Sequence, residues 1–418
     1  MMNEKGEKSC EKFYRNKFLR RYFILKPYDA FGNRAEEIYF ALLKCRREKK
    51  RLILLKLMTN LFYKFKFRKS NLELLNIQHP IIVRNPFLDL LNYFVTLVFA
   101  IFRIMGIILR KIKYLMGYQP ENIFLQASEH PINRNAIWRS RVSWEWDLQN
   151  LLNVSYGSRQ IIESAFPILK GMKYVCLHVR TGGFFNDHDE AKFRNANIEN
   201  YFPAIKELVS RGYLVVRLGD SSMPKISLDG VIDYANSPQK SEKNDILLIE
   251  HCNFYIGSQS GPIDTAALFE KRILTINSTS LSHCCWYRHG SLFIPRKAVI
   301  DNKILSLKEQ IEHDLFEIKG TGTMNELVTY RENSCEEILD AVNEFLEFKE
   351  LDPFQDNFNK FLEEKIIDYF DKTIFFKIKK YDELEKNRWI SRLQNMKGSI
   401  CKGYLVKNWD EKSPFPNN

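Results

Sequence analysis

The chain has 418 residues, of which 45% are apolar and 13% aromatic, and its formal net charge is +12. This composition is ample for the cores of two or three domains, so it indicates a globular protein and excludes a low-complexity chain. The positive charge predicts an anionic partner, and nucleic acid, an acidic membrane surface and a nucleotide-bearing substrate all stay open.

The cysteines and the first residues bear on the cellular compartment. None of the eight cysteines forms a CxxC pair, and several lie in apolar runs where they serve as small hydrophobic residues. Cys284 and Cys285 have zinc-binding neighbours in His283 and His289, but the cluster lacks a second pair of ligands, so local packing is the preferred interpretation. No apolar segment of signal-peptide length follows Met1. We expect a cytoplasmic protein with no metal and no resident cofactor.

The first regular pattern is a strand, a turn, a helix and a second strand. Residues 22–25 and 52–55 are apolar runs that predict strands, residues 27–34 predict a turn, and residues 35–48 predict a helix. This order is typical of a β-loop-α-β unit.

The predicted turn carries candidate ligand groups. Gly32 lies where a backbone can approach a ligand, and Asn33 and Arg34 follow it. Glu36 and Glu37 fall on the expected first helical turn, where the helix dipole favours carboxylates. An ordinary turn with capping charges explains the same pattern.

Residues 87–113 are the most apolar window of the chain. A membrane span needs about 20 predominantly apolar residues, and here Arg103 interrupts the run. We therefore expect no span. The run ends in a basic and aromatic segment, residues 110–114, and residues 62–69 are also basic and aromatic, which favours a helix at an anionic bilayer surface. A helix buried against a sheet or in a domain interface is the alternative.

Strands and helices alternate in the second half. This alternation is typical of a parallel sheet covered by helices on both faces. The expected strands are 174–179, 213–218, 231–234, 253–257 and 272–276, and the expected helices are 199–211, 241–252, 263–269 and 336–346.

Polar residues follow three of these strands at the point where each strand ends. In open α/β sheets the carboxyl ends of the strands face the crevice where ligands bind, so we expect these residues to meet in one crevice. They are His178 and Arg180, then Gly219 and Asp220, and then Ser258, Gln259, Ser260 and Gly261.

Arg180 is the first of these candidates, because an arginine at a strand end before a flexible glycine pair can hold a phosphate or carboxylate in a bidentate grip. The alternative is a surface ion pair for Arg180 and a satisfied core position for His178.

The serines form the second candidate. Hydroxyls and backbone N–H groups at the start of a helix, with Pro262 in its first turn, make an anion site, although N-capping by Ser260 alone explains part of the pattern. Asp220 could accept from a ribose or base, or cap a turn with Ser221 and Ser222.

Several nucleotide signatures are missing from the sequence. There is no GxGxxG or GxxxxGK[ST] at a strand-to-helix junction, which argues against dinucleotide oxidoreduction and P-loop phosphotransfer. There is also no Asp-x-Asp element of the kind that holds a divalent metal on a nucleotide sugar. Charge on a leaving diphosphate would then be stabilised by Arg180, hydroxyls and a helix N-terminus.

The order of four segments resembles a family of bacterial glycosyltransferases from surface-polysaccharide gene clusters and is more distantly similar to the GT-B fucosyltransferase superfamily. The resemblance covers roughly residues 171–346, and "AFGNRAEEIYFALL" resembles the N-terminal loop and helix of that superfamily. The four segments are "CLHVR", "NIENYFPAIKELVSRGYLVVRLGD", "VIDYANSPQKSEKNDILLIEHCNFYIGSQSGP" and "YRENSCEEILDAVNEFL".

The resemblance implies roles for particular residues. Arg180, in the His-x-Arg element, would hold the donor diphosphate, and His178, Asp220, Ser258 and Ser260 would shape the nucleotide pocket.

This chain departs from the fucosyltransferase pattern after Arg180, where Thr181-Gly182-Gly183 replaces a basic and an acidic residue, so a preference for GDP-fucose is not expected. Candidate groups acting on the acceptor are Asp187, His188, Asp189 and Glu190, together with Gly32, Asn33, Arg34, Glu36 and Glu37.

These observations predict a GT-B-like α/β protein with two Rossmann-type parallel-sheet domains facing a cleft. The expected parts are a basic leader, 1–19, an acceptor-side domain, 20–165, a nucleotide-sugar-binding domain, 166–350, and a C-terminal packing tail, 351–418.

The expected function is sugar transfer from a nucleotide sugar to a surface-polysaccharide or lipid-linked glycan precursor, inverting and metal-independent, at the inner face of the cytoplasmic membrane. The alternative is a non-catalytic glycan- or membrane-binding protein. A nucleic-acid partner is not expected, because no recognised module accompanies the charge.

Overall fold

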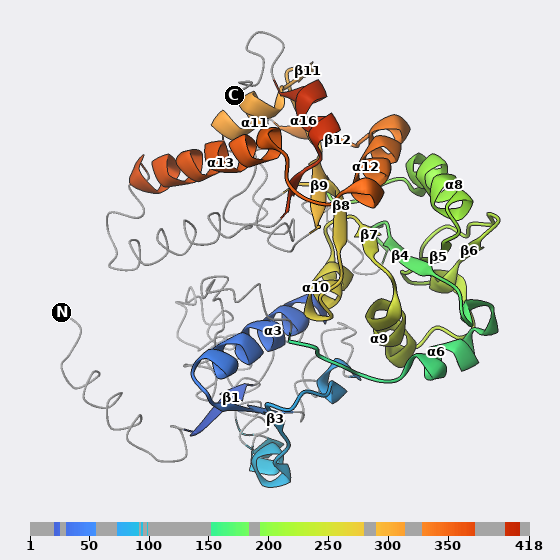
Figure 1. Ribbon diagram of the computed structural model, residues 1–418, viewed down its shortest axis with the longest axis vertical. Coiled ribbons are helices and arrows are strands. Elements are labelled where there is room, and N and C mark those ends of the chain that lie inside the picture. The colour runs from blue at the N-terminus through green and yellow to red at the C-terminus, as the bar shows by residue number, and fades with distance from the viewer. Residues whose placement is uncertain are drawn as a thin grey trace, which may run out of the picture. The chain divides into compact units, whose positions relative to one another are not determined.

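The computed structural model describes residues 21–25, 31–55, 73–91 with 93, 94 and 98, 152–183, 193–279, 290–313, 328–372 and 398–409. The chain separates into two compact units, Met1–Arg141 and Val142–Asn418. Each unit contains a parallel sheet and helices, which confirms the predicted α/β class (Figure 1).

The first unit is built on a three-stranded parallel sheet of order β1-β2-β3. Helix α3 connects β1 to β2 and packs on both of these strands, so the predicted β-loop-α-β unit is confirmed. The bounds are β1 Tyr22–Leu25, α3 Phe31–Arg47, β2 Arg51–Leu54, the 3-10 helix η2 Glu73–Asn76, and β3 Ile82–Val83.

The turn predicted over residues 27–34 is wrong in its second part, because α3 already begins at Phe31. Gly32, Asn33 and Arg34 therefore lie in the first helical turn, and Glu36 and Glu37 lie beyond it. A glycine costs a helix about 1 kcal/mol. The buried face of α3 outweighs that cost, since it includes Arg34, Ala35, Ile38 and Leu42, all 0% exposed.

The second unit is organised around a seven-stranded sheet of order β13-β9-β8-β7-β4-β5-β6, in which every pairing is parallel. The strands are β4 Tyr174–His178, β5 Leu214–Arg217, β6 Val231–Ile232, β7 Tyr255–Gly257, β8 Ile273–Ser278, β9 Leu292–Pro295 and β13 Ser399–Ile400. A small antiparallel sheet contains β11 Lys303–Ile304, β10 Lys297–Ile300 and β12 Thr329–Arg331.

Helices cover both faces of the large sheet (Figure 1). Helices α8 and α12 lie on one side, and α6, α9 and α10 lie on the other. The central strands β4, β7 and β8 are buried along their whole length, which is why they appear in the sequence as short, mainly apolar runs. The helices are α6 Arg159–Ala165, α8 Phe202–Ser210, α9 Glu242–His251, α10 Gly261–Leu268, α11 Leu307–Glu312, α12 Cys335–Glu347, α13 Pro353–Lys372 and α16 Lys402–Asn408.

The strand order reverses between β4 and β7. From β4 the chain first adds β5 and β6 on one side and then returns to add β7, β8 and β9 on the other. Ligands of open α/β sheets bind outside the carboxyl ends of the strands at such a switch point. The topology therefore singles out the ends of β4 and β7.

The division between the units falls after Arg141, whereas the sequence analysis placed it after residue 165. The buried Glu250 side chain on α9 explains the difference. It accepts hydrogen bonds from Ser155 Oγ at 2.9 Å, from Tyr156 N at 2.9 Å and from Gly157 N at 3.1 Å, and so holds this segment on the second unit.

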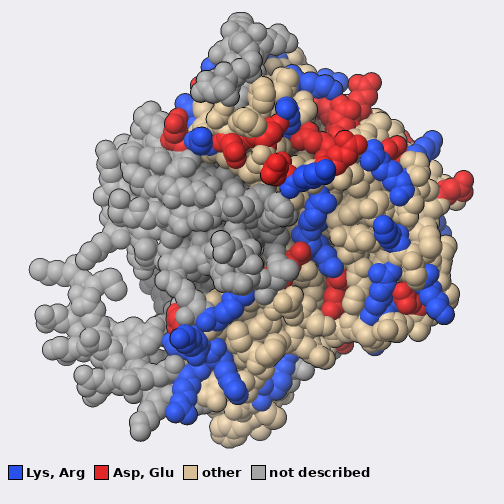
Figure 2. Space-filling model, viewed as in Figure 1, with Lys and Arg blue, Asp and Glu red and all other residues tan. Residues whose placement is uncertain are grey.

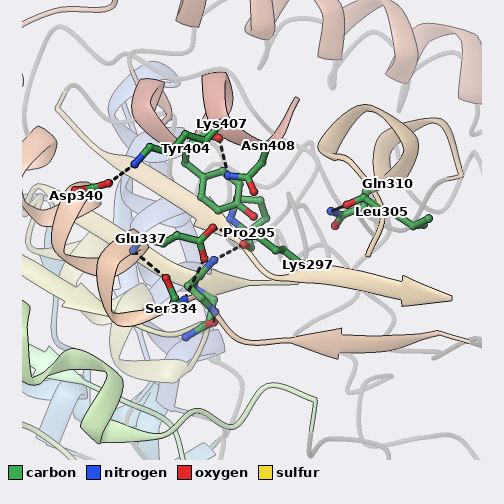
Figure 3. Close-up of polar contacts among 12 residues, drawn as sticks. Pro295, Lys297, Leu305, Gln310, Ser334, Glu337, Asp340, Tyr404, Lys407 and Asn408 are labelled. Carbon is green, nitrogen blue, oxygen red and sulfur yellow. Dashed lines mark hydrogen bonds and ion pairs between the residues drawn. The ribbon is translucent and has the colours of Figure 1, made fainter. Parts of the chain in front are cut away.

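The C-terminal segment is part of the second unit. Strand β13 pairs with β9 at the edge of the large sheet, and α16 packs on α12. Figure 3 shows Lys407 of α16 reaching Asp340 of α12 at 2.6 Å. The same helix starts with a reciprocal capping box of Ser334 and Glu337, and Glu337 also pairs with Lys297 at 2.6 Å (Figure 3).

Glu344 on α12 holds this segment through its carboxylate, which accepts from the first two backbone N–H groups of α16. We expect Glu344→Ala to lower the free energy of unfolding by about 1–3 kcal/mol, because these donors lose their acceptor. Asp340→Ala is the matched control one turn away, and it should cost under about 1 kcal/mol because the Asp340–Lys407 pair is exposed. Urea denaturation measures both, and equal losses in the two variants would contradict this account.

Candidate functional site

The three predicted strand ends lie side by side, because β7, β4 and β5 are consecutive in the sheet. The switch point falls between β7 and β4, so the residues after these two strands are the centre of the candidate site.

Ser258 fastens the end of β7 to the end of β4. Its backbone N–H donates to His178 O at 3.0 Å, and its hydroxyl accepts from Arg180 N at 2.8 Å. Gly257 permits this approach, since a Cβ there would stand 2.6 Å from His178 O. The backbone on both sides of His178 is thereby fixed.

Ser260 directly precedes α10, but its side chain does not cap the helix, so the alternative of N-capping by Ser260 is wrong. Its hydroxyl instead lies 2.9 Å from His178 Nδ1 and donates to Ser258 O at 3.0 Å. Both contacts are hydrogen bonds if Nδ1 carries the proton of the neutral ring, and Nε2 is then an acceptor. The cross-strand histidine therefore determines where the serine hydroxyl points.

His178 is held neutral. Burial lowers the pKa of His178 to about 4, and the positive charges of Lys240 and Arg180 act in the same direction. Asp220 opposes them and is the weaker influence. The ring is therefore uncharged at physiological pH.

Arg180 is buried and held through its backbone and its side chain. Its carbonyl accepts from Ala196 N at 3.0 Å, its N–H donates to Ser258, and its Nη1 donates to Asn195 Oδ1. These hydrogen bonds fix the position of the guanidinium group, so less side-chain entropy is lost when it binds an anion.

Asp220 and Gly219 form the turn that follows β5. Asp220 Oδ1 accepts from Ser222 N at 2.9 Å and from the Ser222 hydroxyl, so the alternative of a turn cap is confirmed. Gly219 has a φ of +152°, and a Cβ there would meet Met223 Sδ at 2.2 Å. A side chain at this position would therefore disrupt the turn.

Gln259 points away from the switch point. Its side chain is buried, and Oε1 accepts from Thr279 N at 3.2 Å and from Thr279 Oγ1 at 3.0 Å. These two hydrogen bonds fix Thr279, the residue that follows β8. Gly261 is the first residue of α10.

The remaining candidates lie either outside the described residues or in the first unit. Asp187 and its neighbours 188–190 lie outside the described residues, as do Cys284 and Cys285 with their two histidines. Within the described ranges no group of three or more His, Cys, Asp or Glu could hold a metal ion. In the first unit, Arg34 is fully buried and Glu37 is nearly so.

Arg296 is a buried arginine next to the candidate site that the sequence analysis did not name. It directly follows β9, is 3% exposed, and donates from Nη2 to the carbonyl of Asn195, the residue whose side chain accepts from Arg180. The signal was present, because Leu292–Pro295 followed by arginine repeats the pattern of an apolar strand ending in Arg180.

The positive charges of Arg180 and of Lys240, which is paired with Asp245, act on the neutral His178, and Arg296 lies close enough to Arg180 for their charges to interact, so this end of the sheet suits an anion. On the face drawn in Figure 2, acidic side chains gather toward the top, where Figure 1 places α11, α12 and α16. Lysines and arginines gather at the lower left of that face and are spread over its right side (Figure 2).

No protein-family model and no curated protein matches the chain. Among solved structures, the chain is similar to the E. coli ADP-heptose LPS heptosyltransferase II, with 11% identity, a TM-score of 0.40, and coverage of 78% of this chain and 98% of that one. It is also similar to a glycosyl transferase of family 9 from Veillonella parvula, with 11% identity, a TM-score of 0.41, and coverage of 78% and 97%.

A third similar structure is the dodecameric iron-containing heptosyltransferase TibC in complex with ADP-D-beta-D-heptose, with 14% identity, a TM-score of 0.30, and coverage of 63% of this chain and 60% of that one. With so few identical residues and such low TM-scores, these likenesses carry no argument about function.

The lowered pKa of His178 predicts a pH dependence of stability. Because the folded-state pKa of about 4 lies below the usual value near 6.5, the unfolded chain binds more protons between these values. Stability should therefore be complete above about pH 6.5 and fall as the pH drops toward 4, by about 3 kcal/mol from this residue. Urea unfolding of the parent and of His178→Asn at pH 7 and pH 4 measures the difference, and an equal loss in both proteins would refute the assignment.

Proposed function

We propose that this protein is a glycosyltransferase that moves a sugar from a nucleotide-sugar donor to a surface-polysaccharide or lipid-linked glycan precursor. The observation that carries the proposal is the position of Arg180, a buried guanidinium fixed at the carboxyl end of β4 beside the switch point and beside the start of α10. Phosphate groups bind at such positions because arginine and the start of a helix both favour negative charge.

The proposed donor pocket is formed by the ends of β4, β5 and β7. The diphosphate lies against Arg180 and the start of α10. The Nε2 atom of His178, an acceptor in the neutral ring, and the turn of Gly219 and Asp220 are available to the nucleoside. Gln259, which was also predicted to bind the nucleotide, is left out of this pocket because its side chain accepts from Thr279 N.

In the proposed reaction an acceptor hydroxyl oxygen forms a bond to the anomeric carbon, and the bond from that carbon to the diphosphate breaks with both electrons going to the diphosphate. Attack opposite the leaving group inverts the configuration. Arg180 stabilises the departing charge, so the proposed chemistry is metal-independent. The hydroxyl proton passes to a carboxylate, for which Glu37 and Asp187 are the candidates.

Arg180→Ala tests the donor site. We expect it to weaken the binding of nucleoside diphosphates by at least about tenfold and to abolish measurable transfer, because a charge-assisted bidentate contact is lost. Calorimetry against ADP, GDP, UDP and CDP, followed by transfer assays with the matching sugars, measures both. Arg211→Ala is the matched control, since Arg211 is exposed at the end of α8 and pairs with Glu207.

Unchanged affinity in Arg180→Ala would contradict the site assignment. A parent protein that binds no nucleotide would favour the alternative of a non-catalytic glycan- or membrane-binding protein.

The proposal includes peripheral attachment to an anionic membrane at its cytoplasmic face. In the first unit, residues 86–91, 93, 94 and 98 are helical, and their apolar side chains fall on one face of the helix at the spacing i, i+3, i+4, i+7 and i+11. These side chains are between 46% and 72% exposed, and we call them the apolar stripe: Phe87, Leu90, Leu91, Phe94 and Val98. Exposure of the stripe supports the membrane-surface interpretation over a buried helix. None of the helices in the described ranges is long and apolar enough to cross a bilayer.

Phe87→Ser with Leu91→Ser tests this attachment. Because each apolar side chain contributes about 1.5–3 kcal/mol when fully buried, we expect binding to vesicles of anionic lipid to weaken by at least about tenfold. Flotation of the protein with such vesicles measures binding. Ile168→Ser is the matched control, since Ile168 is as exposed but lies in the second unit. Equal flotation of the double variant and the parent would remove the membrane from the proposal.

A further inference from the structure

Two arginines from distant strands converge on one residue in the second unit. Arg180 follows β4 and Arg296 follows β9, and β7 and β8 lie between these strands in the sheet. Three strand spacings of about 4.8 Å separate the two backbones, so the long side chains close the gap. Arg180 Nη1 donates to Asn195 Oδ1, and Arg296 Nη2 donates to the carbonyl oxygen of the same Asn195.

Arg296 is an incompletely satisfied cation. It is 3% exposed, and its Nε has no hydrogen-bond partner among the described residues. Burial lowers the pKa of Arg296, and the positive charge of Arg180 acts in the same direction. Arg296 therefore has a buried donor that an anion can satisfy, and the positive charge of Arg180 nearby favours a ligand that carries negative charge.

Glu332 is the acidic group that faces Arg296 and opposes this effect. Its carboxylate, however, accepts from Asn197 N at 2.9 Å and from Asn200 Nδ2 at 3.3 Å. Within the described part of the chain no ion pair joins Glu332 to Arg296. An ion pair with Glu332 therefore does not account for the buried charge of Arg296.

We propose that Arg180 and Arg296 form a two-guanidinium site for a diphosphate, in which Asn195 positions both side chains before the anion binds. This inference rests on the proposed function, because it assigns the second arginine to the leaving diphosphate of the same donor. A single phosphate can be held by one planar guanidinium fork, whereas a diphosphate presents oxygens to two. Arg296 then neutralises part of the charge that develops on the diphosphate as the bond to the sugar breaks.

The test compares Arg296→Gln with Arg296→Lys by calorimetry, using inorganic pyrophosphate, phosphate, and nucleoside di- and monophosphates as probes. We expect Arg296→Gln to weaken binding of pyrophosphate and nucleoside diphosphates by at least about tenfold while changing monophosphate binding by no more than about twofold. Arg296→Lys, which keeps the charge but not the fork, should fall between Arg296→Gln and the parent and is the variant to use if Arg296→Gln does not fold.

Glu332→Gln is the matched control, because it removes the negative charge facing Arg296 and keeps a hydrogen-bond acceptor for Asn197 and Asn200. It should bind pyrophosphate as tightly as the parent or more tightly.

The failures of the two proposals are distinguishable. If the parent binds nucleoside diphosphates and Arg180→Ala loses them, but Arg296→Gln and Arg296→Lys bind both phosphate classes as the parent does, the two-guanidinium site is refuted and the donor site stands. Equal weakening of mono- and diphosphate binding in both Arg296 variants would also refute it. If the parent binds pyrophosphate through both arginines but no nucleotide, the anion site stands and the glycosyltransferase proposal fails.

Discussion

The hydrogen bonds of Ser258 to β4 hold together the part of the second unit on which the candidate site depends. One bond runs from Ser258 N to His178 O and the other from Arg180 N to Ser258 Oγ, so two strands that are far apart in the sequence share one fixed edge. Gly257 is the sequence requirement for this contact, because any Cβ there would collide with the His178 carbonyl. The direction of the Arg180 side chain, and with it the proposed anion site, follows from this contact.

The electrostatics of the site follow from the same packing. Burial keeps His178 neutral, and the charges nearby are mostly positive, since Lys240 and Arg180 both act on the ring. A neutral histidine surrounded by cations adds hydrogen-bonding capacity without adding to the repulsion among them. The positive charge of Arg180 favours an anionic ligand at this end of the sheet.

Much of the second unit could be predicted from the sequence because parallel strands buried on both faces are continuous apolar runs, as residues 174–179 illustrate. Strand β13 could not be predicted this way. It is only Ser399–Ile400, and its backbone pairing with Leu292 and Phe293 defines it more than its own side chains do. The start of α3 was misplaced because Gly32 and Asn33 are typical turn residues, whereas burial of Arg34 and Ala35 favours the helix.

For the candidate site, the strand ends could be predicted from the sequence but the directions of the side chains could not. The structure places the strands that Arg180 and Ser258 follow next to each other. Side-chain direction depends on contacts across the sheet, which no local pattern contains. For that reason the sequence could not show that Ser260 contacts His178 without capping its helix, or that the Gln259 side chain accepts from Thr279. Arg296 required the knowledge that β9 belongs to the same sheet.

Hydrogen exchange with and without a nucleoside diphosphate tests the central claim most directly, because it reports where on the chain an anion binds. The account predicts slower exchange for the amides of residues 179–183 and 258–261 at the ends of β4 and β7, with no change in α12 on the other side of the sheet. Protection confined to other elements, or spread equally over the whole second unit, would contradict it.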